Sequence, residues 1–307
     1  MIATYAVAYA SALRAASEAA AGQNYPPGAL YMVATPIGNL ADITLRALHV
    51  LQIADTIACE DTRHSQALLR AYGIDKSAAQ LLALHQHNEA EAAQTVIERL
   101  RRGERVAYAS DAGTPAISDP GARLVAAVRL EGLTVIPLPG ASSVTTALSV
   151  AGIWGEGAQH GEFVFAGFLA SKSSERTSAV EALRGEPRAV VMLEAPHRIE
   201  ALATALATLG ARPVTVGREL TKQFEEIATV SAEGLPAWLA QDANRLRGEF
   251  VLVLHPAQTA AQAGPDSRVL KLLLAELPLK TAVKLAAEIT GEARNTLYEL
   301  ALSLKKS

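Results

Sequence analysis

The sequence predicts an α/β protein with a parallel-sheet N-terminal domain, a mixed-sheet C-terminal domain and a small helical C-terminal appendage. From residue 29 onward, short apolar runs alternate with helical segments, which is typical of strands joined by crossover helices. Two apolar runs lie close together within 213–230, which indicates an antiparallel hairpin and hence a mixed sheet. The pattern beyond residue 265 is helical. The expected units are an N-terminal extension (1–27), two α/β domains (28–151 and 160–256) and the appendage (266–307).

In the first domain, five apolar runs are expected to form strands, with helices between them. The predicted strands are 29–35, 55–60, 81–85, 105–110 and 133–138. The predicted helices are 43–53, 62–72, 89–101 and 122–131. Strands that alternate with helices at this spacing form a largely parallel sheet that is covered on both faces.

Glycine-rich and polar stretches separate the remaining units. The stretch 152–161 has four glycines and no periodicity, so we interpret it as the domain boundary. The strands expected after it are 162–168, 188–194, 213–220, 225–230 and 249–255. A linker is expected at 256–265, followed by helices at 266–275, 279–289 and 293–304. The single turn Thr290-Gly291-Glu292 resembles that of a helix-turn-helix, although a plain helical hairpin is the commoner explanation.

Composition excludes several classes of protein. No uncharged apolar run approaches the roughly 18 residues of a membrane-spanning helix. The alanine-rich residues 1–27 lack a basic start and contain Arg14 and Glu18, so a secretory signal is not expected. We expect a frayed or loosely docked helix there. The single cysteine, Cys59, lies in an apolar run, which fits a buried thiol and a reducing, cytoplasmic setting.

The net charge of the chain indicates which kinds of partner it can bind. The net charge of −3 argues weakly against a chain that grips RNA mainly through phosphates, although local basic patches still permit such binding. The spacing of His, Cys and Asp residues predicts no metal site.

Three loops after predicted strands carry residues that a core does not need. They are 35–40, with Pro36 and Gly38, then 110–121, and 139–143. Ligands bind at the carboxyl ends of parallel strands, where all three loops are expected to lie. None is a G-x-G-x-x-G or Walker loop, which disfavours dinucleotides and nucleoside triphosphates.

The second and third loops each allow a purely structural explanation. In the second, Asp119 is expected to cap the next helix with Pro120 in its first turn, which leaves the stretch 111–114 as the ligand contact. In the third, Ser142 is either a helix cap or part of a helix start whose N–H groups meet a ligand.

Six ordered motifs resemble a known family. The strings are VATPIGNLADITLRAL, CEDTRHS, SDAGTPAISDPG, PGASS, EAPHRI and ELTKQFEE. Together they resemble the ribosomal RNA small subunit methyltransferase I family, a branch of the tetrapyrrole (corrin/porphyrin) methylases. The resemblance implies a two-domain tetrapyrrole-methylase-like fold that binds S-adenosyl-L-methionine between its domains. It further implies a homodimer that methylates the 2′-oxygen of a cytidine ribose in the decoding region of 16S rRNA, free or in the small ribosomal subunit.

The resemblance also implies cofactor contacts, carried over by position. They are Pro36, Gly38, Ala112, Gly113, Thr114, Ile117, Ser142, Ser143, Glu194 and Leu220. Relatives that act on tetrapyrroles have Gly-Asp-Pro where this chain has Gly113-Thr114-Pro115, and this departure favours the RNA branch.

A ribose hydroxyl is a poor nucleophile, so a general base or a stabilising cation is expected. The candidates are Asp61, which orients or deprotonates the hydroxyl, Arg63, which holds a phosphate, and His197 as an alternative base. A strand-end cap with a solvated ion pair explains Asp61 and Arg63 equally well.

Basic side chains suggest where RNA would bind. The candidates are Lys172, Arg176, Lys222, Lys280, Lys284 and Arg294. A solvated surface is the ordinary alternative for each of them. Two rival functions remain open, namely methylation of a small tetrapyrrole and non-catalytic RNA binding in ribosome assembly.

Overall fold

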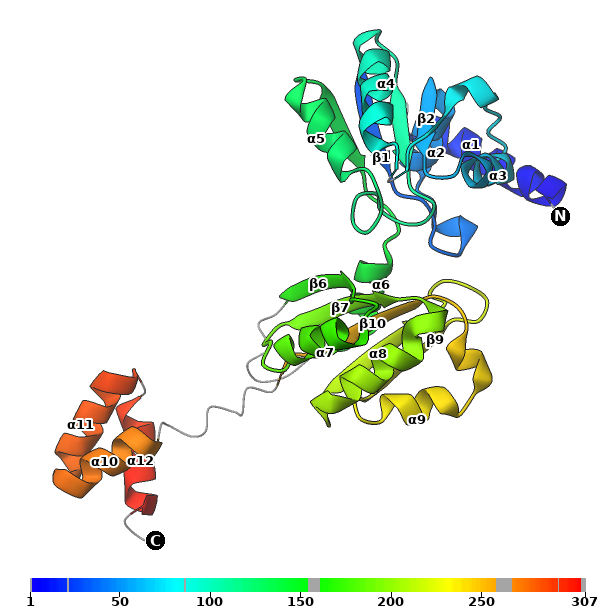
Figure 1. Cartoon of the computed structure of the whole chain (residues 1–307). Helices are drawn as coiled ribbons and strands as arrows, with labels where there is room; N and C mark the ends of the chain where they lie inside the picture. Colours follow the sequence, from blue (N-terminus) through cyan, green and yellow to red (C-terminus); the bar gives the residue numbers. More distant parts are fainter. Residues whose placement is uncertain are drawn as a thin grey trace.

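The computed structural model describes residues 2–20, 22–85, 87–153, 161–257, 267–291 and 293–304. Two five-stranded sheets follow one another along the chain, and three C-terminal helices stand apart from both (Figure 1). The predicted fold class is thereby confirmed. Within the described residues, no helix combines the length and the apolar character needed to cross a bilayer.

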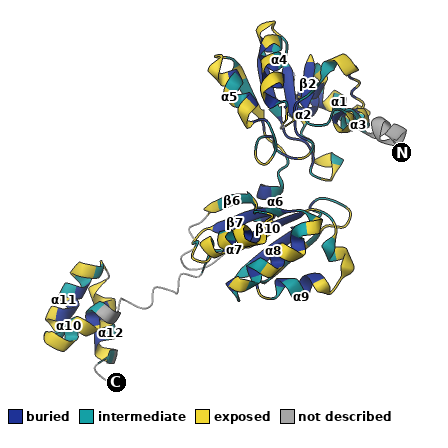
Figure 2. Cartoon of the chain, in the orientation of Figure 1, coloured by how far each residue is buried: buried dark blue, intermediate teal, exposed yellow. Residues whose placement is uncertain are grey.

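The first sheet is wholly parallel and has the strand order β3-β2-β4-β1-β5. Its strands are β1 (Ala29–Val33), β2 (Thr56–Cys59), β3 (Leu81–Ala83), β4 (Val106–Ala109) and β5 (Thr134–Leu138). In β1, Tyr31 packs in the core on one face, whereas Leu30 packs in the core on the other. Alternate residues of a strand point to opposite faces, so a sheet covered on both sides has continuous apolar strands, which are buried in Figure 2.

The helices of the first domain match the predicted periodicity closely. They are α2 (Leu45–Ile53), α3 (Thr62–Ala71), α4 (Glu89–Arg101) and α5 (Ala122–Leu130), followed by α6 (Ser143–Val150). One cap was predicted wrongly. The N-cap of α5 is Gly121 and not Asp119, so Pro120 precedes the helix. The carboxylate of Glu89, on α4, accepts the Gly121 N–H at 3.1 Å and so does the work expected of Asp119.

The N-terminal extension forms a helix, α1 (Ile2–Ala20), as expected, but it is firmly docked. Ala16 and Ala20 are buried, and Tyr9 and Leu13 pack against the core beneath α2 and α3. From Tyr9 onward, the expectation of a frayed or loosely docked helix is therefore wrong. Small alanine side chains let α1 approach its neighbours closely enough to bury one face.

The second sheet is mixed and has the order β6-β7-β10-β8-β9. Its strands are β6 (Phe163–Phe168), β7 (Ala189–Glu194), β8 (Pro213–Arg218), β9 (Glu226–Ser231) and β10 (Phe250–Leu254). The predicted hairpin is present, since β8 and β9 pair antiparallel from Pro213–Ser231 to Arg218–Glu226. Only β6 and β7 pair in parallel.

Helices cover both faces of the second sheet. α7 (Ser173–Ala182), α8 (Ile199–Leu206) and α9 (Leu235–Ala240) belong to the second domain, and residues of all three pack into one core. The opposite face is covered by α6, whose Val144 and Ala147 pack with Val191 and Val251. The last helix of the first domain therefore docks on the second sheet, which ties the two domains together.

The C-terminal helices have a core of their own. They are α10 (Ser267–Glu276), α11 (Leu279–Thr290) and α12 (Arg294–Leu304). Leu270, Val283 and Leu297, one from each helix, are buried together. Gly291 ends α11 with a left-handed φ of 76°, a conformation that glycine adopts without strain. Most of the expected domain boundary (154–160) and of the expected linker (258–265) lies outside the described residues.

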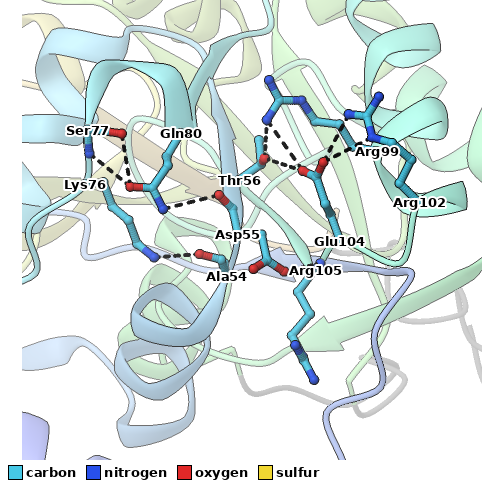
Figure 3. A network of polar contacts seen from close by, with 10 residues as sticks. All are labelled: Ala54, Asp55, Thr56, Lys76, Ser77, Gln80, Arg99, Arg102, Glu104 and Arg105. Carbon is cyan, nitrogen blue, oxygen red and sulfur yellow. Dashed lines mark hydrogen bonds and ion pairs between the residues drawn. The ribbon is translucent and has the colours of Figure 1, made fainter.

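The arginines at the end of α4 belong to a structural network and not to an open basic patch (Figure 3). The Thr56 hydroxyl and the Arg102 guanidinium both donate to Glu104 at 3.0 Å, and Arg99 also contacts Glu104. The backbone N–H of Arg105 donates to Asp55 at 2.8 Å. These contacts fasten the amino ends of β2 and β4, at the sheet edge opposite the three loops.

Candidate functional site

The three loops named above converge at the carboxyl edge of the first sheet. Thr35 and Gly113 exchange two backbone hydrogen bonds of 3.0 Å, which joins the first loop to the second. The Thr114 hydroxyl donates to the Ala141 carbonyl at 2.9 Å, which joins the second loop to the third. Each loop is thereby fixed by another loop as well as by its strand.

Glycine is needed at two of these junctions. Gly113 has a φ of +83°, which side-chain-bearing residues rarely adopt, and a Cβ there would lie 3.2 Å from Ile37. A Cβ on Gly140 would lie 2.8 Å from the Cβ of Ala34. The backbones of the loops therefore pack closely against each other, and a flat ligand has room beside them.

A cleft of about 400 Å³ opens next to this junction. It is lined by Pro36, Ile37, Gly38, Leu40, His64, Ala67, Leu68, Ala71, Asp111, Ala112, Lys222 and Glu249. The first loop, α3 and the second loop supply the wall from the first domain, and Lys222 and Glu249 supply the wall from the second. The volume falls within the range of about 300–1,000 Å³ that is usual for small-molecule sites.

Helix α3 contributes one of its faces. His64, Ala67, Leu68 and Ala71 follow the i, i+3, i+4, i+7 spacing that places side chains on one side of a helix. Asp61 caps this helix, since its carboxylate accepts the N–H of Arg63 at 2.8 Å.

The loop between β8 and β9 contacts the first loop directly. The backbone N–H of Asn39 donates to the Thr221 hydroxyl at 3.1 Å, and the Lys222 side chain packs on Gly38. Glu219 and Thr221 have φ values of 50° and 66°, in the left-handed region that non-glycine residues seldom occupy. Such backbone strain persists where surrounding contacts enforce it and is frequent at functional sites.

Lys222 is held by two carboxylates. Its ammonium lies 2.9 Å from Glu219 Oε1 and 3.0 Å from Glu249 Oε2. Burial acts to lower the pKa of Lys222, but its hydrogen bonds to Glu219 and Glu249 outweigh this and raise it. Lys222 is therefore a charged, anchored part of the cleft wall.

Three acidic side chains lie on or beside the second loop, and of these Asp111 lines the cleft. The Glu60 carboxylate accepts the Asp111 N–H at 3.2 Å, and burial, with the charges of Asp119 and Asp111, raises the pKa of Glu60. Burial also raises the pKa of Asp119. Asp111 Oδ1 is buried and has no hydrogen-bond partner in the described part of the chain. The cleft thus offers an unpaired acceptor on Asp111, which suits a cationic or hydroxyl-bearing ligand.

Comparison with known proteins places the chain in a family. The model of tetrapyrrole (corrin/porphyrin) methylases matches residues 29–236, and that of the RsmI C-terminal HTH domain matches residues 260–305. The ribosomal RNA small subunit methyltransferase I of Escherichia coli O157:H7 is 48% identical over 279 residues, which cover 90% of this chain and 95% of that protein. Its namesake in Neisseria meningitidis serogroup A is 48% identical over 282 residues, with 91% and 94% covered.

The chain belongs to the ribosomal RNA small subunit methyltransferase I family. Solved structures agree on the fold. A cobalt precorrin-4 methyltransferase has a TM-score of 0.53 at 20% identity, covering 75% of this chain and 98% of that one. A uroporphyrin-III C-methyl transferase from Thermus thermophilus, in complex with S-adenyl homocysteine, has a TM-score of 0.52 at 18% identity, with 74% and 96% covered. The C-terminal helices allow two interpretations, a helix-turn-helix or a plain helical hairpin. The match to the RsmI C-terminal HTH domain supports the first.

The family resemblance had suggested ten cofactor contacts, and the structure brings most of them to one place. Pro36, Gly38 and Ala112 line the cleft directly. Gly113 and Thr114 form the junctions between the loops. Ser142 and Ser143 lie at the start of α6, where Ser142 is the N-cap but its side chain makes no capping hydrogen bond.

The other three suggested contacts differ. Ile117 is half exposed and lies outside the cleft lining. Leu220 buries its side chain in the core under α6, and only its backbone approaches Gly38. Glu194 is buried, with its Oε1 3.0 Å from Arg198 Nε. It follows Leu193, which packs with α6, so its side chain points to the opposite face of the sheet and away from the cleft. The Glu194 side chain therefore lies apart from the cleft lining, and its predicted contact with the cofactor stays a prediction.

Asp61 and Arg63 precede His64, which lines the cleft, but none of the three catalytic candidates is in the lining itself. Asp61 and Arg63 form a solvent-exposed ion pair of 3.2 Å. The hydrogen bond from the Arg63 side chain, with that from its backbone, lowers the pKa of Asp61, and a lower pKa makes a weaker general base. His197 is exposed in a short 3-10 helix, Pro196–Arg198. Asp61 and Arg63 thus form the strand-end cap and solvated ion pair that a purely structural role predicts. Their role with RNA stays a prediction.

The basic candidates for RNA contact fall into two groups. Lys172, Lys280, Lys284 and Arg294 are exposed. Arg176 is buried and donates to the backbone carbonyl of Ser171 at 2.9 Å, so it is not free to hold a phosphate. Lys222 is occupied by its two carboxylates. Arg176 and Lys222 thus make structural contacts, and their predicted contact with RNA stays a prediction.

Several cleft residues were not predicted. The face of α3 that begins at His64 could have been found from its helical spacing after β2. Glu249 could not, because only the antiparallel pairing of β8 with β10 brings it beside Lys222. Within the described residues, no group of three or more His, Cys, Asp or Glu side chains could hold a metal ion.

Proposed function

We propose that this chain transfers the methyl group of S-adenosylmethionine to the 2′-hydroxyl of a cytidine ribose in the decoding region of 16S rRNA. The observation that carries the proposal is that Pro36, Gly38 and Ala112 line one and the same cleft. They come from two loops whose sequences resemble motifs of the family. The closely similar relatives are named as methyltransferases of small-subunit ribosomal RNA, which supports this substrate.

The cleft residues fit this cofactor. Gly38 and Gly113 let the first loop pack directly against the β8–β9 loop and the second loop, since a Cβ would meet Lys222 at the first and Ile37 at the second, so the walls of the cleft are fixed before a planar adenosine binds. The unpaired Oδ1 of Asp111 can accept a hydrogen bond from a hydroxyl or an ammonium group. The related uroporphyrin methylase binds S-adenyl homocysteine, which supports a similar ligand in this fold. We propose Pro36, Gly38, Ala112, Gly113, Thr114, Ser142 and Ser143 as its contacts, with the Leu220 backbone and Ile117 at the margin.

When bound, the cofactor supplies an already activated methyl group on a sulfonium. The protein must then align the ribose hydroxyl with it and exclude water. We propose that Arg63 holds an RNA phosphate and that Asp61 or His197 orients the hydroxyl or receives its proton. The lowered pKa of Asp61 favours the orienting role for that residue.

RNA would be held by exposed cations outside the cleft. Lys280 and Lys284 lie one helical turn apart on α11, and Arg294 begins α12. A helix-turn-helix is a common nucleic-acid-binding unit, so we propose that this appendage, together with Lys172, contacts the rRNA. A chain acting on ribosomal RNA would work in the cytoplasm.

We also propose a homodimer, because the family resemblance implies one. Phe163, Phe168 and Phe224 expose 43%, 54% and 68% of their surface on the second domain, and a partner could cover such apolar side chains. Sedimentation should then report twice the chain mass of 32.2 kDa.

The decisive test supplies methyl-labelled S-adenosylmethionine with either free 16S rRNA or small subunits and maps the labelled nucleotide. Label on one cytidine ribose is expected. Label on a base, or no label on RNA, would overturn the proposal. Turnover of a tetrapyrrole in a parallel reaction would favour the rival methylase function, and binding of RNA without any transfer would favour a non-catalytic assembly protein.

A further inference from the structure

Helix α1 lies outside the part of the chain that the tetrapyrrole methylase model matches, which begins at residue 29. It nevertheless contributes to the core. Tyr9, Leu13, Ala16 and Ala20 recur at helical spacing, and this face packs against α2 and α3. The Ser17 hydroxyl adds a hydrogen bond of 3.1 Å to Gln52 on α2.

Tyr72 connects α1 to the wall of the cleft. Its side chain is fully buried, and its ring meets that of Tyr9 edge-to-face, with centroids 5.0 Å apart and planes at 79°. Its hydroxyl donates to the carbonyl of Leu40 at 2.7 Å. Leu40 itself lines the cleft, so two contacts separate α1 from the ligand site.

The two faces of α3 explain how this connection can matter. Leu68 and Ala71 line the cleft, whereas Leu69 and, just beyond the helix, Tyr72 are buried in the core on which α1 packs. Leu68 also packs against that core. A movement of α1 would therefore act on the helix and on the first loop together, because interiors are close-packed and transmit displacement.

We infer that α1 is a brace for the cofactor cleft, and that Tyr9 and Tyr72 are positioning residues that fix the Leu40 wall. The identity of the ligand rests on the proposed function. A wall held in place before binding needs less ordering when the ligand arrives, so the brace increases affinity without touching the ligand.

The first test is calorimetric titration with S-adenosylhomocysteine. Tyr72→Phe removes only the hydroxyl, and Tyr9→Ala removes the ring behind it. Each change should raise Kd about three- to tenfold, the factor that corresponds to one ordinary hydrogen bond. Ser17→Ala is the matched control, because it removes a hydrogen bond between α1 and α2 whose partner, Gln52, does not line the cleft. Its Kd should equal that of the unmodified protein.

A double variant tests the route. If Tyr9 acts through Tyr72, then Tyr9→Ala combined with Tyr72→Phe should raise Kd no more than the larger single effect. Effects that multiply would overturn the route through Tyr72, and unchanged Kd values in both single variants would overturn the brace itself.

Hydrogen exchange provides a readout that needs no ligand. The amides of residues 40–43 should exchange faster in Tyr9→Ala and in Tyr72→Phe but not in Ser17→Ala. If the amides of residues 40–43 exchange no faster in Tyr9→Ala and Tyr72→Phe than in Ser17→Ala, the brace is contradicted. If the unmodified protein binds no S-adenosylhomocysteine, the proposed function fails, while the exchange rates still decide whether α1 fixes the wall.

Discussion

Replacing Gly38 with alanine tests how closely the two domains meet at the cleft. A Cβ at this position would lie 2.4 Å from Lys222 Cγ, 2.8 Å from Thr221 Oγ1 and 3.1 Å from the Leu220 carbonyl oxygen. One of these neighbours is backbone and another accepts the Asn39 N–H, so the overlap is relieved only by moving the two loops apart. Gly38 does not have a left-handed φ, and the effect is therefore steric.

Overpacking of this kind costs about 1–3 kcal/mol, which corresponds to about a 5- to 150-fold loss of affinity if the bound state needs the loops in contact. Calorimetry with S-adenosylhomocysteine should show a Kd at least about tenfold higher for Gly38→Ala, a threshold in the lower part of that range. Gly185→Ala is the control, because nothing lies within 4 Å of its added Cβ and its φ is ordinary. A Gly38→Ala variant that binds as tightly as the control would refute the close contact between the domains at a functional cleft.

Three further results are expected. Burial acts to raise the pKa of Glu219, but the hydrogen bonds from Lys222 and from the Glu249 N–H, with the charges of Lys222 and Arg218, together outweigh it and lower the pKa. These contacts therefore stabilise the fold above about pH 4.5, and their contribution is lost as the pH falls below it. Thermal melts of Lys222→Met should consequently depend less on pH in that acidic range than melts of the unmodified protein; equal dependence would contradict the pairing. Changing Lys280 and Lys284 together to glutamate should weaken rRNA binding and flatten its salt dependence while Kd for S-adenosylhomocysteine stays constant, and an equal loss of both would count against an RNA role for α11. Asp61→Asn should lower kcat for rRNA methylation by about 10²-fold if the carboxylate takes the proton and far less if it only orients the ribose, and an unchanged kcat would remove Asp61 from the mechanism.

Most helices and strands of the fold could be predicted from local sequence patterns. The helix at 89–101 was predicted to the residue, because its apolar spacing runs unbroken from an acidic first turn to a basic last turn. The predicted strand 29–35 is longer than β1, since Thr35 leaves the strand to pair with Gly113. Alternation and turn residues do not show where a strand stops pairing with its neighbours.

The site was predictable where it depended on loops after parallel strands. Pro36 and Ala112 line the cleft as expected, because the topology fixes which ends of the strands meet. The Glu194 side chain lies apart from the cleft lining, since one step along a strand reverses the direction of the side chain. The buried position of Arg176 and the two carboxylates around Lys222 depend on tertiary contacts that charge alone does not reveal.

The most direct measurement is a structure of the complex with S-adenosylhomocysteine. The ligand should lie between the Pro36 loop and the Ala112 loop, with the β8–β9 turn against its open side and a polar atom of the ligand on Asp111 Oδ1. A ligand bound elsewhere on the chain, or one held without contact to either loop, would contradict the claim that these strand-end loops form the cofactor site.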